Sequence, residues 1–410
     1  MQKNSEKTAY LFRRLLRVGT AFLLCAALLA GIYAMCGQMT RRDYLYISPH
    51  IEQAHQDELA EDLRAENYQE LVSAILRLVE DSAESGIIQL HNYGGDLQSV
   101  QSDVQNACRS VSTTEPLGAY AVEYMLFECT RILSYYEVEI SIAYRRSPQQ
   151  VEAIQKIANS AEFRSAIILA YRSYAPSVTL DIQYYNDSQY DPQDIVSEVY
   201  YSYPIEMMDL PSCTVNFYPE NGLHRILEIS FEYSDTPENL RRMAVDVANT
   251  LLALISQPTS DSSPLDTLIR LHDMLIELVE YYPQLENDLS GEPQRTSEFS
   301  IYGALVQHRA TSEGYALAFK ALCNIYNINC KVITGRYNGM SHAWNIVEYN
   351  GKYYHVDVSA DKELNTYDFL LKTDEQVSST HKWNNIAYEV CAGPEVELFP
   401  SSGAGESAVG

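Results

Sequence analysis

Basic residues are scarce in this 410-residue sequence, which has 29 Lys and Arg against 55 Asp and Glu and a formal net charge of -26. So acidic a surface repels phosphate groups, which excludes nucleic acid as a partner. The eight cysteines include no C-x-x-C pair, so nothing indicates a zinc site or a redox pair. The sequence also lacks a phosphate-binding glycine loop and an EF-hand loop, and we therefore expect no cofactor and no metal.

Charge is distributed unevenly along the chain. Residues 1–17 contain five basic residues and one acidic residue, whereas the 23 residues from 18 to 40 contain no charged residue. About 20 apolar residues cross a bilayer as a helix, so we expect a transmembrane helix over 18–40. The positive-inside rule then predicts a cytoplasmic basic segment, an anchor in the cell membrane and an extracytoplasmic bulk. A cleaved signal peptide is the alternative interpretation.

The middle of the chain contains an internal repeat. Residues 41–85 are predicted to be a juxtamembrane helical segment, and residues 86–257 to be a duplicated α+β region whose two copies are offset by 89 positions. EISIAYRRSP at 139–148 recurs as EISFEYSDTP at 228–237. In each copy a predicted strand leads to Ser147 or Thr236, which precedes Pro and is suited to cap a helix. Such a duplication indicates a spacer or a partner-binding module.

The C-terminal part begins after a linker rich in Ser and Pro at 256–264 and is predicted to form a domain over 264–390, followed by a disordered tail over 391–410. A helix is expected to start near Ser312, and antiparallel strands joined by Asn-Gly turns to follow it. Pairing across Asn350-Gly351 brings Asp357 within a residue or two of His342. The three side chains then form a nucleophile, base and orienting acid.

These residues resemble a known family. Gly314-Tyr315-Ala316, the block His342-Ala343-Trp344-Asn345 and the block from Tyr353 to Asp357 are similar to the three signature blocks of bacterial transglutaminase-like domains, which are relatives of papain-like cysteine proteases. The resemblance covers roughly 264–390. It implies an α+β domain with a helix packed on an antiparallel sheet, in which His342 is the general base and Asp357 orients it.

The chain departs from the family at the position of the nucleophile, where Ser312 stands in place of cysteine. A serine hydroxyl is far less acidic than a thiol and is not ionised by a helix N-terminus and a histidine. Cys323 lies on the same helix but about 16 Å further along it, and Cys330 opens the next strand, so neither is expected to serve. Ser312 is therefore either a helix cap and vestige or a working nucleophile.

We expect a pseudoenzyme that binds a peptide or a cell-wall peptide without cutting it. The alternative is an active amide hydrolase or acyl transferase that uses a Ser312-His342-Asp357 triad. His308 and His381 are predicted to be structural.

Overall fold

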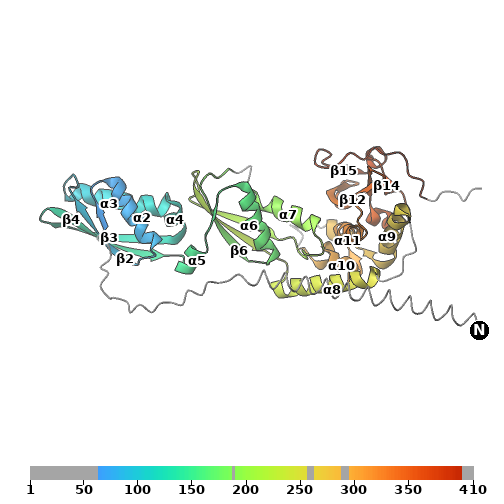
Figure 1. Cartoon of the computed structure of the whole chain (residues 1–410), viewed down its shortest axis with the longest axis horizontal. Helices are drawn as coiled ribbons and strands as arrows, with labels where there is room; N and C mark the ends of the chain where they lie inside the picture. The colour runs from blue at the N-terminus through green and yellow to red at the C-terminus, as the bar shows by residue number, and fades with distance from the viewer. Residues whose placement is uncertain (1–62, 187–189, 256–262, 288–294, 399–410) are drawn as a thin grey trace, which may run out of the picture. The chain divides into compact units, whose positions relative to one another are not determined.

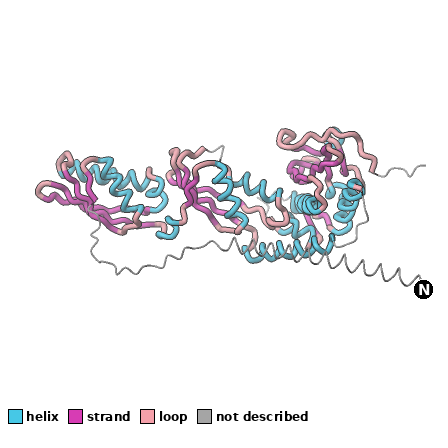
Figure 2. Tube along the Cα trace, viewed as in Figure 1, coloured by secondary structure: helices cyan, strands magenta, loops and turns pink. Residues whose placement is uncertain are grey.

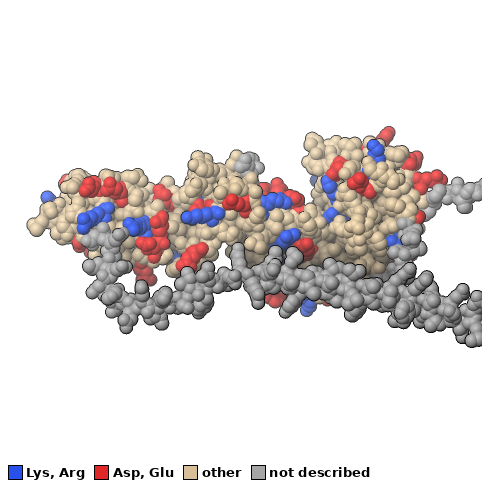
Figure 3. Space-filling model, in the orientation of Figure 1, with Lys and Arg blue, Asp and Glu red and all other residues tan. Residues whose placement is uncertain are grey.

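The computed structural model describes residues 63–186, 190–255, 263–287 and 295–398, and their fold is α+β (Figure 1). The basic segment 1–17, the expected span 18–40 and the tail from residue 399 lie outside the described residues. On the face drawn in Figure 3, acidic and basic side chains are interspersed.

The expected N-terminal transmembrane helix is corrected by the structure. Within the described ranges, no helix combines the length and the apolar character that crossing a bilayer requires. The longest of these helices, α8 (Pro237–Ile255), carries charged residues such as Arg241 and Asp246 and buries a single stripe made of Leu240, Met243, Val247 and Leu251. A helix with one apolar stripe packs against protein, because its charged face would be desolvated in lipid.

The first α+β unit is a four-stranded sheet with helices on one face, as Figure 2 shows. Its strand order is β1-β2-β4-β3, in which β1 pairs parallel with β2 and the other pairs are antiparallel. Residues 63–80, which the sequence placed in a juxtamembrane segment, form its first strand and first helix. Its elements are β1 (Leu63–Ala65), α2 (Tyr68–Glu80), β2 (Ser85–His91), α3 (Leu97–Thr113), α4 (Pro116–Ala121), β3 (Val122–Ile132) and β4 (Tyr135–Tyr144).

The second α+β unit has the same strand order, β5-β6-β8-β7, with the same parallel and antiparallel pairings. In both units a capped helix with Pro at its first turn follows the last paired strand. Ser147 accepts a hydrogen bond from Gln150 N–H, and Thr236 accepts one from Asn239 N–H. The elements are α5 (Pro148–Glu152), β5 (Gln155–Ile157), α6 (Ser160–Arg172), β6 (Ser177–Ile182), α7 (Pro192–Ser202), β7 (Ser212–Tyr218) and β8 (Arg225–Glu232), which α8 follows.

The C-terminal domain contains an antiparallel sheet of order β14-β13-β12-β11-β15. The Asn-Gly sequences form the two predicted hairpin turns, because both residues of each pair have positive φ: 49° and 88° at Asn338 and Gly339, and 51° and 70° at Asn350 and Gly351. The strands are β11 (Cys330–Tyr337), β12 (Met340–Tyr349), β13 (Lys352–Val356), β14 (Leu370–Lys372) and β15 (His381–Trp383).

Helices and short segments complete this domain. One face of the sheet packs on the buried helix α11 (Ser312–Ile325), and strand alternation places Ala343 and Val347 on that face. The remaining elements are α9 (Pro264–Leu278), β9 (Glu280–Tyr281), η1 (Pro283–Asn287), η2 (Ser297–Phe299), α10 (Ile301–Leu305), β10 (Arg309–Ala310), α12 (Val358–Leu364) and α13 (Asp374–Val377).

Candidate active site

Ser312 is the first residue of α11, and the N-cap is the preceding residue, Thr311. The Ser312 hydroxyl accepts a hydrogen bond from Ala343 N–H on β12 at 3.1 Å, which ties the first turn of α11 to the sheet. The side chain is 2% exposed. The hydroxyl therefore lies at the junction of helix and sheet and does not occupy the N-cap position.

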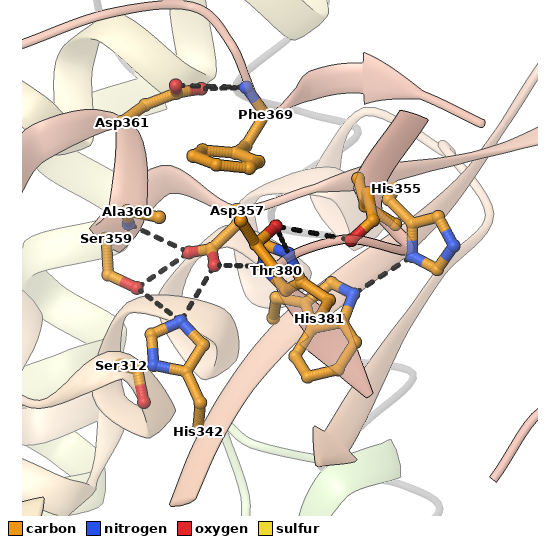
Figure 4. Close-up of polar contacts among 12 residues, drawn as sticks. Ser312, His342, His355, Asp357, Ser359, Ala360, Asp361, Phe369, Thr380 and His381 are labelled. Carbon is orange, nitrogen blue, oxygen red and sulfur yellow. Dashed lines mark hydrogen bonds and ion pairs between the residues drawn. The ribbon is translucent and has the colours of Figure 1, made fainter. Parts of the chain in front are cut away.

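His342 and Asp357 meet through the hairpin that the sequence predicted. Asn345 on β12 is opposite Val356 on β13, which puts Asp357 one position beyond the last pair. His342 Nε2 lies 2.7 Å from Asp357 Oδ2, and both side chains are buried. Figure 4 shows the Ser312 hydroxyl beside the His342 ring, on the side of the ring that faces away from Asp357. The structure thus brings all three predicted site residues together.

Asp357 is the centre of a larger hydrogen-bond network. Its Oδ1 accepts from Ser359 Oγ at 2.7 Å and from Ala360 N–H at 3.0 Å, while its Oδ2 lies 3.0 Å from His381 Nε2. Burial opposes ionisation of this carboxyl, but the positive charge of His342 and the hydrogen bonds from both histidines outweigh burial and hold its pKa well below the ordinary value. Asp357 is therefore ionised at neutral pH.

His381 is a member of the site that the sequence did not assign. It was predicted to be structural, and the structure places it on the same carboxylate oxygen as His342. The His381 ring packs against Tyr337, Trp344 and Phe369, with ring centroids 4.9 to 5.1 Å apart. The only sequence signal was its position near the end of the family resemblance, because β15 reaches the site by pairing with the distant strand β11.

The signature blocks explain how the helix and the sheet fit together. A Cβ on Gly314 would lie 2.6 Å from Glu298 O and 2.8 Å from the Ala310 Cβ, so only glycine lets the neighbouring segment approach α11. The Asn345 amide donates to Ala316 O at 3.0 Å and ties β12 to the same helix. These contacts fix the distance between Ser312 and His342.

Two clusters in the described part of the chain have donor atoms within reach of one ion: His342, Asp357 and His381, and His355, Asp374 and Cys391. In the second cluster Trp344 N–H donates to His355 Nδ1, so the proton of a neutral ring is on Nε2, which faces Asp374 at 2.8 Å. Burial lowers the pKa of His355, which favours that neutral ring. A metal at Nε2 would have to displace its only proton. In the first cluster, Nε2 to Oδ2 distances of 2.7 and 3.0 Å fit hydrogen bonds.

The six cysteines of the described residues do not enter the site. Cys323 and Cys330 are buried in the core between α11 and β11, and burial raises the pKa of the Cys323 thiol well above its ordinary value. All six cysteines of the described residues are free. No described cysteine therefore supplies the thiol that is absent at position 312.

A second buried pair, His272 and Asp361, is connected to Asp357 through the backbone of Phe369. Asp361 on α12 lies 3.2 Å from His272 Nε2 on α9, and it accepts a hydrogen bond from Phe369 N–H at 3.0 Å. Phe369 in turn accepts at its carbonyl from Asp357 N–H at 3.0 Å. No sequence pattern indicates this pair, because its members come from segments far apart in the chain.

The arrangement has the parts of a nucleophilic acyl-transfer site. A hydroxyl lies at a helix start, a histidine lies beside it, and an ionised carboxylate orients that histidine. A thiol in place of the hydroxyl would be favoured as thiolate by the helix N-terminus and by His342 in its protonated form.

One family model and two solved structures are similar to parts of this chain. Residues 254–358 match the model of the transglutaminase-like superfamily. No curated protein matches the chain. A solved structure of a TGase is similar to this chain at 10% identity and a TM-score of 0.25, and the match covers 55% of this chain and 65% of the TGase. A proposed cysteine protease from Cytophaga hutchinsonii is similar at 13% identity and a TM-score of 0.23, and the match covers 38% of this chain and 64% of that protein. This chain thus spans just under two thirds of each. Residues 254–358 are thus similar in sequence to the transglutaminase-like superfamily.

Proposed function

We propose that the C-terminal domain is a catalytically impaired transglutaminase-like domain that binds a peptide or a cell-wall peptide. One observation carries the proposal: His342 and Asp357 are bonded at 2.7 Å and buried beside the helix start, while position 312 holds a hydroxyl. The base and the orienting acid are thus retained without the thiol that they would activate. Peptide is the ligand class implied by the relationship to cysteine proteases. A cell-wall peptide is one member of that class.

The impairment follows from the acidity of the two groups. A thiol has a pKa near 8.5, and a helix N-terminus with an imidazolium lowers it enough to form a thiolate at neutral pH. A hydroxyl is not ionised under these conditions and has to lose its proton during attack, as in serine hydrolases. Ser312 also receives a hydrogen bond from Ala343 N–H. We expect this site to hold a peptide carbonyl without cleaving the amide.

Restoring the thiol tests the proposal. In the full chain carrying Ser312→Cys, alkylation of position 312 by iodoacetamide, followed across pH by peptide mass spectrometry, should have a midpoint at least about one pH unit below the ordinary thiol value of about 8.5. The His342→Ala change in the same background should return the midpoint to the ordinary value. A stem peptide of peptidoglycan or a digest of casein, added in excess, should slow the alkylation because bound peptide covers the site.

The wild-type chain tests the alternative, an active Ser312-His342-Asp357 triad. The hydrogen bond of 2.7 Å between His342 Nε2 and Asp357 Oδ2 favours this alternative. Treatment with a fluorophosphonate should leave Ser312 unmodified. An adduct on Ser312 that disappears in His342→Ala would overturn the impaired reading in favour of a serine enzyme. Alkylation that neither peptide source slows would contradict the peptide-binding part alone.

A further inference from the structure

Glu313, the neighbour of Ser312 in the first turn of α11, is held by two side chains from outside the helix. Tyr201 on α7 donates to Glu313 Oε1 at 3.1 Å, and Arg295 Nη2 donates to the same oxygen at 2.5 Å. The Glu313 side chain is 13% exposed and that of Arg295 is 29% exposed. Since α7 belongs to the second α+β unit, that unit contacts the residue next to the nucleophile position.

The neighbouring tyrosine reaches the start of the same helix by a second route. Tyr200 donates from its hydroxyl to Phe299 O of η2 at 3.2 Å, and Glu298 O of η2 accepts from Thr311 N–H, the N-cap of α11, at 3.0 Å. The Arg295 guanidinium lies over the Tyr200 ring, 5.7 Å from its centroid. Two adjacent residues of α7 therefore support both the cap and the first turn of α11.

The charge of Glu313 affects how easily a negative charge forms at position 312. A carboxylate in the first turn of α11 stabilises the helix, but its field opposes an anion at position 312, the next residue in the chain. Arg295 neutralises that charge, and Tyr201 donates a hydrogen bond to it. The pKa of Arg295 is raised above its ordinary value because the attraction of Glu313 outweighs burial, so the guanidinium stays charged.

Other charged groups near position 312 are paired among themselves. His342 faces it from β12 and is bonded to Asp357, which His381 also contacts. On the side of η2 and β10, the Glu298 carboxylate is bonded to Arg309. Among these described groups, Glu313 is the acid closest to position 312 in the chain, and its charge balance depends on Arg295 and Tyr201.

We propose that Arg295 and Tyr201 are positioning residues of the transglutaminase-like site, and that the second α+β unit is for this reason a working part of the site and not only a spacer. Together they hold Glu313 away from position 312 and neutralise it, which lowers the cost of negative charge at the nucleophile position. The inference rests on the proposed site, but its residues lie outside the Ser312-His342-Asp357 set.

The test uses the Ser312→Cys background in the full chain and reads the pH midpoint of alkylation at position 312. Arg295→Gln should raise the midpoint by about half to one pH unit, because it leaves the Glu313 charge unbalanced. Arg295→Lys should restore most of the shift, since it returns the positive charge. Tyr201→Phe should raise the midpoint by a smaller amount. Tyr203→Phe, a matched change at the exposed C-cap of the same helix, should leave it unchanged.

Loss of folding is recognised in the same digest, because Cys323 and Cys330 are buried and become alkylated only when the domain opens. Midpoints of Arg295→Gln and Tyr201→Phe equal to that of the parent, with these two cysteines still protected, would overturn the inference. A parent midpoint near the ordinary thiol value would instead contradict the proposed function. The comparison among variants would still decide the inference, because the field of Glu313 acts on the thiol without His342.

Discussion

Replacing Asp361 with alanine should lower the free energy of unfolding by about 3–5 kcal/mol at pH 7, measured by urea denaturation. Asp361 is completely buried, and its oxygens are 3.2 Å from His272 Nε2, 3.0 Å from Thr366 Oγ1 and 3.0 Å from Phe369 N. Alanine supplies no acceptor, so the buried Phe369 N–H and the half-buried Thr366 hydroxyl lose their partner.

Asparagine at the same position should cost much less, about 1–2 kcal/mol. Its carbonyl oxygen can accept from Phe369 and Thr366, and its NH2 group can face His272 if that ring moves its proton to Nδ1, which lies 3.0 Å from Asp273 Oδ1. Burial raises the pKa of Asp361 despite the hydrogen bond with His272. A raised carboxyl pKa contributes stability that is present below the unfolded pKa and is lost as pH rises, so the charge itself adds little at pH 7.

The matched control is Asp181→Ala, which removes the same kind of carboxylate from a more exposed pair. Asp181 Oδ1 lies 2.6 Å from His224 Nε2, with side chains 20% and 46% exposed. Solvent screens such pairs, so the change should stay within about 1 kcal/mol. An Asp361→Ala variant no less stable than Asp181→Ala would contradict the structural role of the buried pair.

The part of the site that the sequence predicts is the part fixed by local signals. Ser312 comes directly after the residue that caps α11, and the Asn350-Gly351 turn sets the register that brings Asp357 opposite the end of β12 near His342. A tight turn leaves one register for the two strands, so counting residues is enough to place both side chains.

The rest of the site depends on contacts between distant segments. His381 reaches Asp357 because β15 pairs with β11, and His272 reaches Asp361 because α9 packs near α12. Tyr201 comes from a different α+β unit altogether. No periodicity or spacing encodes these pairings. The transmembrane prediction came from hydropathy over 18–40, which lies outside the described residues, and none of the described helices is long and apolar enough to cross a bilayer.

Asp357→Asn should abolish the lowered alkylation midpoint of the Ser312→Cys variant and return it to about 8.5 or above, a larger shift than any expected for Arg295 or Tyr201. Oδ2 of Asp357 accepts from both His342 and His381, and Oδ1 accepts from Ser359 and from Ala360 N–H. The amide of asparagine keeps its oxygen as the acceptor for Ser359 and Ala360 and turns its NH2 group toward the two histidines.

This substitution changes the tautomer of His342. Facing an NH2 group, Nε2 has to accept, so the proton moves to Nδ1, on the side of the ring that faces position 312 in Figure 4. A ring in that tautomer cannot take a proton from the nucleophile, and no carboxylate charge remains to stabilise the imidazolium. Unchanged reactivity in Asp357→Asn, with Cys323 and Cys330 still protected, would show that Asp357 does not orient the base.

The same variant should remove an acid-dependent part of the stability. The pKa of Asp357 is held well below the ordinary value of about 3.9, so its charge contributes stability above that unfolded value and loses it as pH falls toward the folded one. The difference in unfolding free energy between wild type and Asp357→Asn should be about 2–3 kcal/mol from pH 5 to 7 and shrink below about pH 4. Asp361→Asn should show no such acid limb, because the pKa of Asp361 is shifted upward. A difference for Asp357 that does not fall with acid would mean that its charge is not held by the two histidines.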